Sequence, residues 1–177
     1  MHPLCGLSLS VVLLLACALS GVALTLVKDG QPAATIVLPA KTEYDGYADK
    51  KGVTDEEQLA AEELQTVIEK ISGAQLPIAT AEAKPAGTLI VLGAEQARAR
   101  GLGKRLDALD KDGLLCTVTG NALILTGKRA RGTLYAAYTF LESLGCRWVF
   151  PGPAGELYPA RKTIDTTINV TQNPSHA

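Results

Sequence analysis

Residues 131–152 read RGTLYAAYTFLESLGCRWVFPG, and this stretch decides most of the fold prediction. Its first half carries apolar side chains at the three- and four-residue spacing of one helix face. These residues are Leu134, Ala137, Tyr138 and Leu141. Gly145 is expected to end the helix, and residues 147–150 predict a short aromatic strand. Pro151 and Gly152 then predict a rigid turn.

A second amphipathic helix is predicted upstream, over residues 54–73. Thr54 and Glu57 have the spacing of a capping box, in which each side chain bonds to the other's backbone amide. Gly73 suits the left-handed position that ends many helices. The expected buried face comprises Ala60, Leu64, Val67, Ile68 and Ile71.

Several β-rich segments surround these two helices. Residues 24–27 and 35–38 flank a polar turn and predict a hairpin, and residues 114–119 and 122–126 predict a second hairpin across Gly120-Asn121. Residues 163–170 alternate between apolar and polar side chains, which predicts one strand with one face exposed to solvent. Shorter strands are expected over residues 76–79 and 88–92. We therefore expect an α/β (α+β) fold: a mixed, mainly antiparallel sheet with two principal helices packed on it.

The N-terminus has the pattern of a secretory signal. An apolar run over residues 11–18 is shorter than a bilayer span and is followed by small residues. Cleavage after Ala23 would leave a mature chain that starts at Leu24. Residues 14–17 also fit a bacterial lipobox, with Cys17 as the lipidated residue, and this remains the alternative. The predicted location is therefore secreted or periplasmic.

Composition narrows the classes of partner. The 17 basic residues nearly balance the 18 acidic residues, so no basic surface is expected to attract nucleic acid. Beyond the signal there is no apolar run long enough to predict a membrane span. Cys116 and Cys146 remain after cleavage, and both lie in apolar strand-like contexts. They are predicted to be buried free thiols.

The residue types that catalysis needs are poorly placed. The two histidines are His2 and His176, close to the ends of the chain, so no histidine-based nucleophile is predicted. No spacing suits a zinc site or a nucleotide loop, and no metal or cofactor is expected. Acidic residues crowd the start of the first helix, where capping and dipole compensation explain them. Glu142 and Glu156 are not predicted to be catalytic acids.

Trp148 is the only tryptophan of the chain. With 5% aromatic residues, the chain has few rings to offer a sugar. Arg147, Trp148 and Pro151 are instead predicted to form a face that contacts another domain. The alternative for Trp148 is a half-buried residue that packs within its own domain.

Three stretches together resemble a known family. They are residues 60–78 (AAEELQTVIEKISGAQLPI), residues 89–93 (LIVLG), and residues 112–148, which include RGTLY and LGCRW. Their order resembles the N-terminal domain of α-glucuronidases and, more distantly, the second domain of β-hexosaminidases. The resemblance implies a domain over residues 24–172 that lies beside a catalytic (β/α)8 barrel. Residues 173–177 would begin the linker to a barrel that is missing from this chain.

Two functions remain open at this point. One is a non-catalytic accessory domain, present here as a fragment, of a secreted carbohydrate-degrading glycoside hydrolase. The other is a stand-alone extracellular module that binds a glycan or a protein. An independent enzyme is the weakest prediction, because no nucleophile, base or metal set stands out in the sequence.

Overall fold

The computed structural model describes residues 23–43, 48–49, 52–53 and 55–174. The predicted signal with Cys17, the capping residue Thr54, and both histidines lie outside these described residues. The helices are α1 (Glu56–Ser72), α2 (Ala94–Ala99), α3 (Gly103–Asp107) and α4 (Ala130–Ser143), with short 3-10 turns η1 (Ala81–Ala83) and η2 (Pro153–Gly155). The strands are β1 (Leu24–Lys28), β2 (Gln31–Pro32), β3 (Ala34–Leu38), β4 (Ala48–Asp49), β5 (Gly52–Val53), β6 (Ile78–Thr80), β7 (Thr88–Leu92), β8 (Leu114–Thr119), β9 (Ala122–Gly127), β10 (Arg147–Trp148), β11 (Glu156–Leu157), β12 (Ile164–Thr166) and β13 (Asn169–Gln172).

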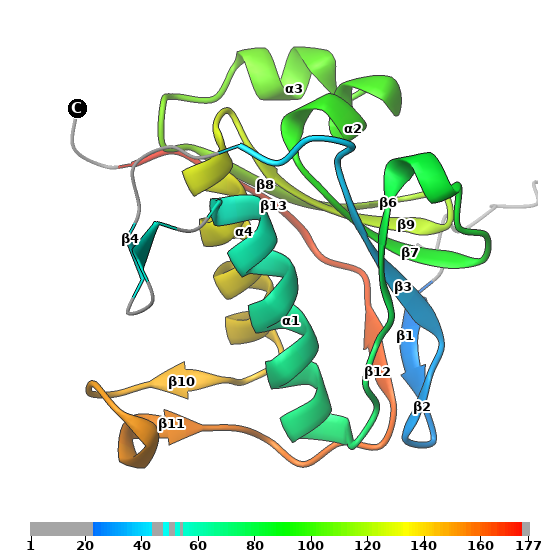
Figure 1. Ribbon diagram of the computed structural model, residues 1–177, viewed down its shortest axis with the longest axis vertical. Coiled ribbons are helices and arrows are strands. Elements are labelled where there is room, and N and C mark those ends of the chain that lie inside the picture. The colour runs from blue at the N-terminus through cyan, green and yellow to red at the C-terminus, as the bar shows by residue number, and fades with distance from the viewer. Residues whose placement is uncertain (1–22, 44–47, 50–51, 54, 175–177) are drawn as a thin grey trace, which may run out of the picture.

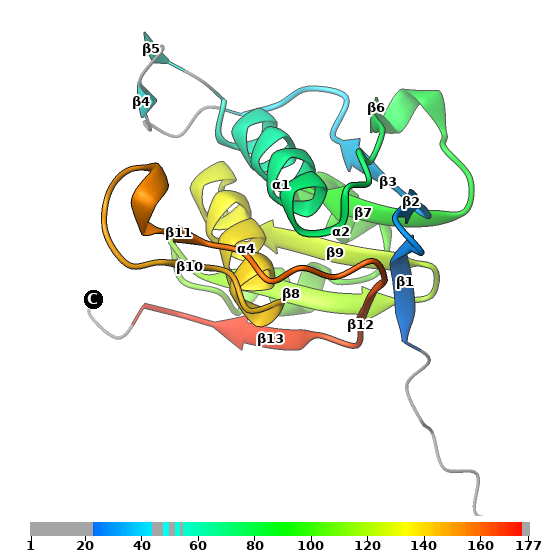
Figure 2. The ribbon, with the colours of Figure 1, turned by 90° about the horizontal axis from the view of Figure 1, so that it is seen from below.

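A six-stranded sheet in the order β13-β8-β9-β7-β3-β6 forms the middle layer of the molecule. The long helices α1 and α4 lie side by side on one face (Figures 1 and 2). The short helices α2 and α3 cover the opposite face, where Ala97 and Leu106 pack on Val91 and its neighbours. Burial of apolar side chains on both faces supplies the main stabilisation of this three-layer arrangement.

The predicted fold class is confirmed. The sheet is mixed, and α1 and α4 are its two principal helices. Over the described strands, antiparallel pairs outnumber parallel ones, and the parallel pairs gather in the central sheet, where β9, β7, β3 and β6 run together. The predicted hairpin of β8 and β9 is present, with Thr119 opposite Ala122.

The hairpin predicted from residues 24–27 and 35–38 is wrong. β1 pairs with β12 and with the two-residue strand β2 in a small separate sheet. β3 instead enters the central sheet, parallel to both β6 and β7. Ile36, Val37 and Leu38 are all buried, and such a continuous apolar run is typical of a strand covered on both faces.

The strand predicted over residues 163–170 is split in two. β12 pairs with β1, whereas β13 pairs with β8 at the edge of the central sheet. At the break, the hydroxyl of Thr166 accepts a hydrogen bond from the amide of Ile168 at 3.2 Å. This local bond replaces the ladder bonding that a continuous strand would need.

Both principal helices bury the faces expected of them. Leu64 of α1 and Leu141 of α4 are fully buried in one core. α1 begins at Glu56 with Asp55 at the N-cap position, and Gly73 ends it in the left-handed conformation with φ +83°. Within the described part of the chain, no helix has the length and apolar character required to cross a bilayer.

Candidate domain interface

Trp148 belongs to an aromatic cluster that fastens the segment after α4 to the helices. Its ring meets Tyr138 of α4 edge to face, with centroids 5.2 Å apart, and meets Tyr158 in the same manner at 6.2 Å. Both geometries are favourable for aromatic pairs. Trp148 is half-buried and its ring packs against the core of the domain, as the alternative for this residue predicted.

Lys70 of α1 makes polar contacts with the same cluster. Its ammonium group lies 3.1 Å from the carboxylate of Glu156 and 4.9 Å from the centre of the Tyr158 ring. The Tyr158 hydroxyl donates to Glu156 Oε2 at 2.8 Å. The hydrogen bond to Glu156 raises the pKa of Lys70, so its charge is retained. These contacts hold β11 against α1.

Arg147 and Pro151 have different surroundings. The Arg147 guanidinium donates to the carbonyl oxygen of Glu142 at 2.9 Å, near the C-terminal end of α4. A cation at this end compensates unpaired carbonyl groups. Pro151 is exposed in the turn that follows β10. The structure therefore places Arg147, Trp148 and Pro151 along one segment, but only Trp148 takes part in the aromatic cluster.

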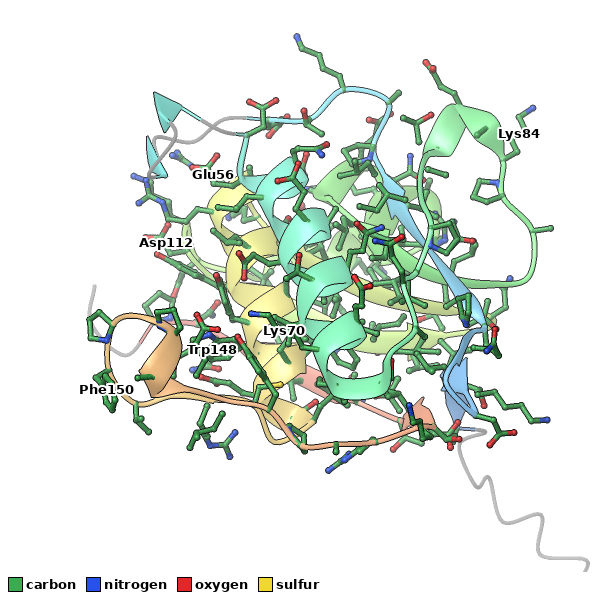
Figure 3. The ribbon with its side chains drawn as sticks, turned by 60° about the horizontal axis from the view of Figure 1, so that its bottom comes forward. Glu56, Lys70, Lys84, Asp112, Trp148 and Phe150 are labelled. Atoms are coloured by element: carbon green, nitrogen blue, oxygen red, sulfur yellow. The ribbon has the colours of Figure 1, made fainter. Side chains whose placement is uncertain are left out.

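Three apolar side chains on this segment face solvent. They are Val149, Phe150 and Leu157, with exposed fractions of 61%, 54% and 53%. We call these three residues the β10–β11 patch. Figure 3 shows Phe150 at the outer end of the segment, whereas Trp148 lies closer to the helices. The sequence predicted a contact face on this segment but did not single out these three residues, although alternation along a strand puts Val149 on the side opposite Trp148.

The turn that carries the patch is tightly built. The amide of Val149 donates to the carbonyl of Gly155 at 3.0 Å, and the amide of Gly155 donates to Gly152 at 2.9 Å. A Cβ atom at Gly155 would collide with the carbonyl group of Phe150. Only glycine permits this close approach, so the exposed apolar side chains sit on an ordered support.

Two carboxylates at the start of α1 bind the loop that precedes the helix. Asp55 makes no capping bond with its side chain, and instead accepts from the Thr42 hydroxyl at 2.5 Å. Glu57 is only 4% exposed and accepts from the amide of Glu43 at 3.2 Å. Burial raises the pKa of Glu57 from 4.5 to about 7. Glu57 thereby holds the preceding loop, and its predicted capping partner Thr54 lies outside the described residues.

The two cysteines are free and buried, as predicted. Cys116 donates to the carbonyl of Ala136 at 3.4 Å, and burial raises the pKa of its thiol to about 12. Burial also raises the pKa of Cys146. Both thiols act as small apolar core residues. In the described ranges, no group of three or more potential metal-ligand side chains comes together.

A family comparison fits this architecture. The model of the glycosyl hydrolase family 67 N-terminus matches residues 40–140, more than half of the chain. The fold and the match define an α/β domain related to glycoside hydrolases. The chain belongs to the family of glycosyl hydrolase family 67 N-terminal domains, which confirms the resemblance to α-glucuronidases. The β10–β11 patch lies beyond the matched residues.

A solved structure shows the same fold. A family GH115 4-O-methyl-alpha-glucuronidase, BtGH115A, with specificity for decorated arabinogalactans, matches with a TM-score of 0.58 and 17% identity. The match covers 86% of this chain and 18% of that one. A GH138 enzyme targeting pectin rhamnogalacturonan II matches at a TM-score of 0.41 and 15% identity, over 63% of this chain and 13% of that one. The search of curated proteins found no match.

Proposed function

We propose that this chain is a non-catalytic accessory domain of a secreted, carbohydrate-degrading glycoside hydrolase. Its role is to pack against the catalytic domain of that enzyme through the β10–β11 patch. Membership of the family 67 N-terminal domains carries the proposal. The chain spans only 18% of the length of the α-glucuronidase that it resembles in fold, which leaves room for a catalytic (β/α)8 barrel of about 250 residues.

The β10–β11 patch supports contact with another protein domain. Valine, phenylalanine and leucine side chains are more than half exposed there, on a short and ordered turn. Exposed apolar clusters of this kind mark interaction sites. Arg147 and Pro151, the residues proposed from sequence, flank the patch and would complete its edge.

Structural contacts of the carboxylates support a role without catalysis. Glu57 binds a backbone amide, Glu156 binds Lys70 and Tyr158, and Asp107 pairs with Arg98 at 2.7 Å. Hydrolysis of a glycosidic bond needs two carboxyl groups that face each other across the sugar. Asp112 and Glu142 line one open pocket, so they are the pair that an activity test must address.

Export fits the boundaries of the fold. β1 begins at Leu24, which is buried and pairs with Thr166. Cleavage after Ala23 would therefore leave every described strand and helix intact. We propose residues 1–23 as the signal peptide, 24–172 as the domain, and 173–177 as the start of the linker. Mass spectrometry of exported protein tests this: an N-terminus near Leu24 is expected, and intact Met1 or lipidated Cys17 would refute it.

An activity assay with a genomic check tests the function. Purified 24–177 should fold and should not hydrolyse aryl glucuronides, aryl hexosaminides or xylo-oligosaccharides. The coding sequence of the parent gene should continue for the length of a barrel. Steady turnover that is lost in Asp112→Asn or Glu142→Gln would overturn the accessory role, as would a natural stop after codon 177.

A further inference from the structure

An open pocket lies between α4, from Tyr135 to Glu142, and the end of β13. It has a volume of about 440 Å³, within the range of small-molecule sites. We call it the α4 pocket. Its polar lining includes Asp112, Tyr135, Thr139, Glu142, Gln172 and Asn173. Asp112 lies near the first turn of α4 (Figure 3).

One wall of the pocket is a polar stripe on α4. Tyr135, Thr139 and Glu142 follow one another at four- and three-residue spacing, so they share one helix face. Tyr135 is 42% exposed, unlike the buried Phe140 of the same helix. An exposed tyrosine offers a flat apolar ring together with a hydroxyl group. Tyr135 thus gives the pocket an exposed aromatic ring, which the sequence did not predict.

The opposite wall holds a carboxylate oxygen without a partner. Asp112 Oδ1 is buried and has no hydrogen bond among the described residues. A buried acceptor of this kind is costly unless a donor reaches it. Asn173 is held beside it, since its side-chain oxygen accepts from the amide of Asp110 at 3.0 Å. The wall is thus fixed, and it brings to the pocket a carboxylate with unused hydrogen-bonding capacity.

We propose that the α4 pocket binds one neutral pyranose residue of a glycan. The carboxylates of Asp112 and Glu142 can accept from sugar hydroxyls, while Thr139 and Gln172 can both donate and accept. The ring of Tyr135 suits the flat apolar face of a sugar. A uronate would meet two like charges. A small organic cation would engage the carboxylates but leave Thr139 and Gln172 unused.

This site does not depend on the proposed accessory function. It uses none of the three residues of the β10–β11 patch. Sugar binding can therefore be observed without domain contact, and domain contact without sugar binding. The two are separated by testing the isolated domain for sugar binding without any catalytic domain present. The domain has its own core on both faces of the sheet, and its folding is checked in the same spectra.

The test is an amide chemical-shift titration of the 24–177 domain. The probes are the methyl pyranosides of glucose, galactose, mannose and xylose, with D-glucuronate and tetramethylammonium as charged comparisons. At least one neutral pyranoside should shift the amides around Tyr135, Glu142 and Gln172, with a Kd of the order of 1 mM. D-glucuronate should bind about tenfold more weakly. Absence of shifts with all four pyranosides, or stronger binding of either charged probe, would overturn the proposal.

Variants locate the site. Tyr135→Ala should abolish the shifts, whereas Leu157→Ala, an exposed apolar residue of the β10–β11 patch, should leave them unchanged. Asp112→Asn should weaken pyranoside binding. It should also reduce the difference in affinity between the pyranosides and D-glucuronate, because one charge that repels the uronate is removed. Unchanged binding in both Tyr135→Ala and Asp112→Asn would place any sugar elsewhere and overturn the assignment.

Discussion

Glu57, in the first turn of α1, accepts a hydrogen bond from the backbone amide of Glu43 in the loop that follows β3. The two atoms are 3.2 Å apart, and the Glu57 side chain is almost completely buried. Burial raises the pKa of this carboxyl to about 7, and the nearby charges of Glu43, Asp55 and Glu56 act in the same direction. The hydrogen bond from Glu43 lowers the pKa, but burial outweighs it.

Stability should fall as pH rises through the window set by Glu57. Between pH 4.5 and about 7, the folded state holds a proton that the unfolded chain has largely lost. The free energy of unfolding consequently decreases over this window and levels off above it. Glu57→Gln keeps an acceptor for Glu43 and removes the charge. It should stabilise the domain at pH 8 by about 1–3 kcal/mol in urea melts.

The matched control for this experiment is Glu62→Gln, an exposed position on the same helix. It should keep the wild-type dependence of stability on pH. Equal pH profiles for Glu57→Gln and the wild type would show that Glu57 does not titrate in this window.

The packing of α1 on α4 gives a second prediction. Leu64→Ala and Leu141→Ala each leave a cavity at a fully buried position, so each should lower the free energy of unfolding by about 2–5 kcal/mol. Glu69→Ala, on the exposed side of α1, should change it by less than about 0.5 kcal/mol. Similar urea midpoints for all three variants would mean that the helix faces are assigned wrongly.

Replacement of Gly132 by alanine is expected to destabilise the domain, the opposite of the usual effect in a helix. An exposed glycine within a helix is usually improved by alanine, by up to about 1 kcal/mol. Here a Cβ atom at Gly132 would lie 2.6 Å from the carbonyl oxygen of Gly113 and 2.8 Å from the Cα of Gly127. Gly132→Ala should therefore destabilise the domain by about 1–3 kcal/mol.

Gly103→Ala is the control for Gly132, because Gly103 also lies in a helix and has room for a methyl group. The nearest atom to its added Cβ would be 3.6 Å away, on the flexible side chain of Arg98. Thermal melts should show Gly103→Ala equal to or above the wild type. A Gly132→Ala domain as stable as Gly103→Ala would contradict the close approach of α4 to the sheet.

Local sequence patterns predicted where helices and strands occur better than they predicted which strands pair. The spacing of Leu64 and Leu141 indicated both helix faces correctly, because period alone determines which side of a helix is apolar. The pairing of β3 was missed, since proximity in the chain favoured a hairpin while burial on both faces required a central parallel strand. The break after Thr166 comes with a change of strand partner and a local side-chain hydrogen bond, which alternation of residues cannot reveal.

The candidate sites show the same division. The sequence placed Trp148 on a contact face, whereas the structure shows its ring packed between Tyr138 and Tyr158. The exposure of Val149 and Phe150 was not distinguished from the half-burial of Trp148, since a four-residue strand was expected where only Arg147–Trp148 is paired. The α4 pocket joins Asp112 to residues of α4 and β13. Such long-range assembly leaves no local sequence signal.

Docking of the catalytic region tests the account most directly. The proposed catalytic domain, expected in the coding sequence after residue 177, should be expressed separately and titrated with the 24–177 domain by isothermal calorimetry. Phe150 is expected to be an anchor residue, because large apolar side chains at the centre of a contact carry much of its free energy. The wild type should bind, and Phe150→Ser should lose at least about tenfold in affinity, whereas Tyr135→Ser should match the wild type. Equal affinity of Phe150→Ser and the wild type, or no binding by either, would contradict the proposed interface.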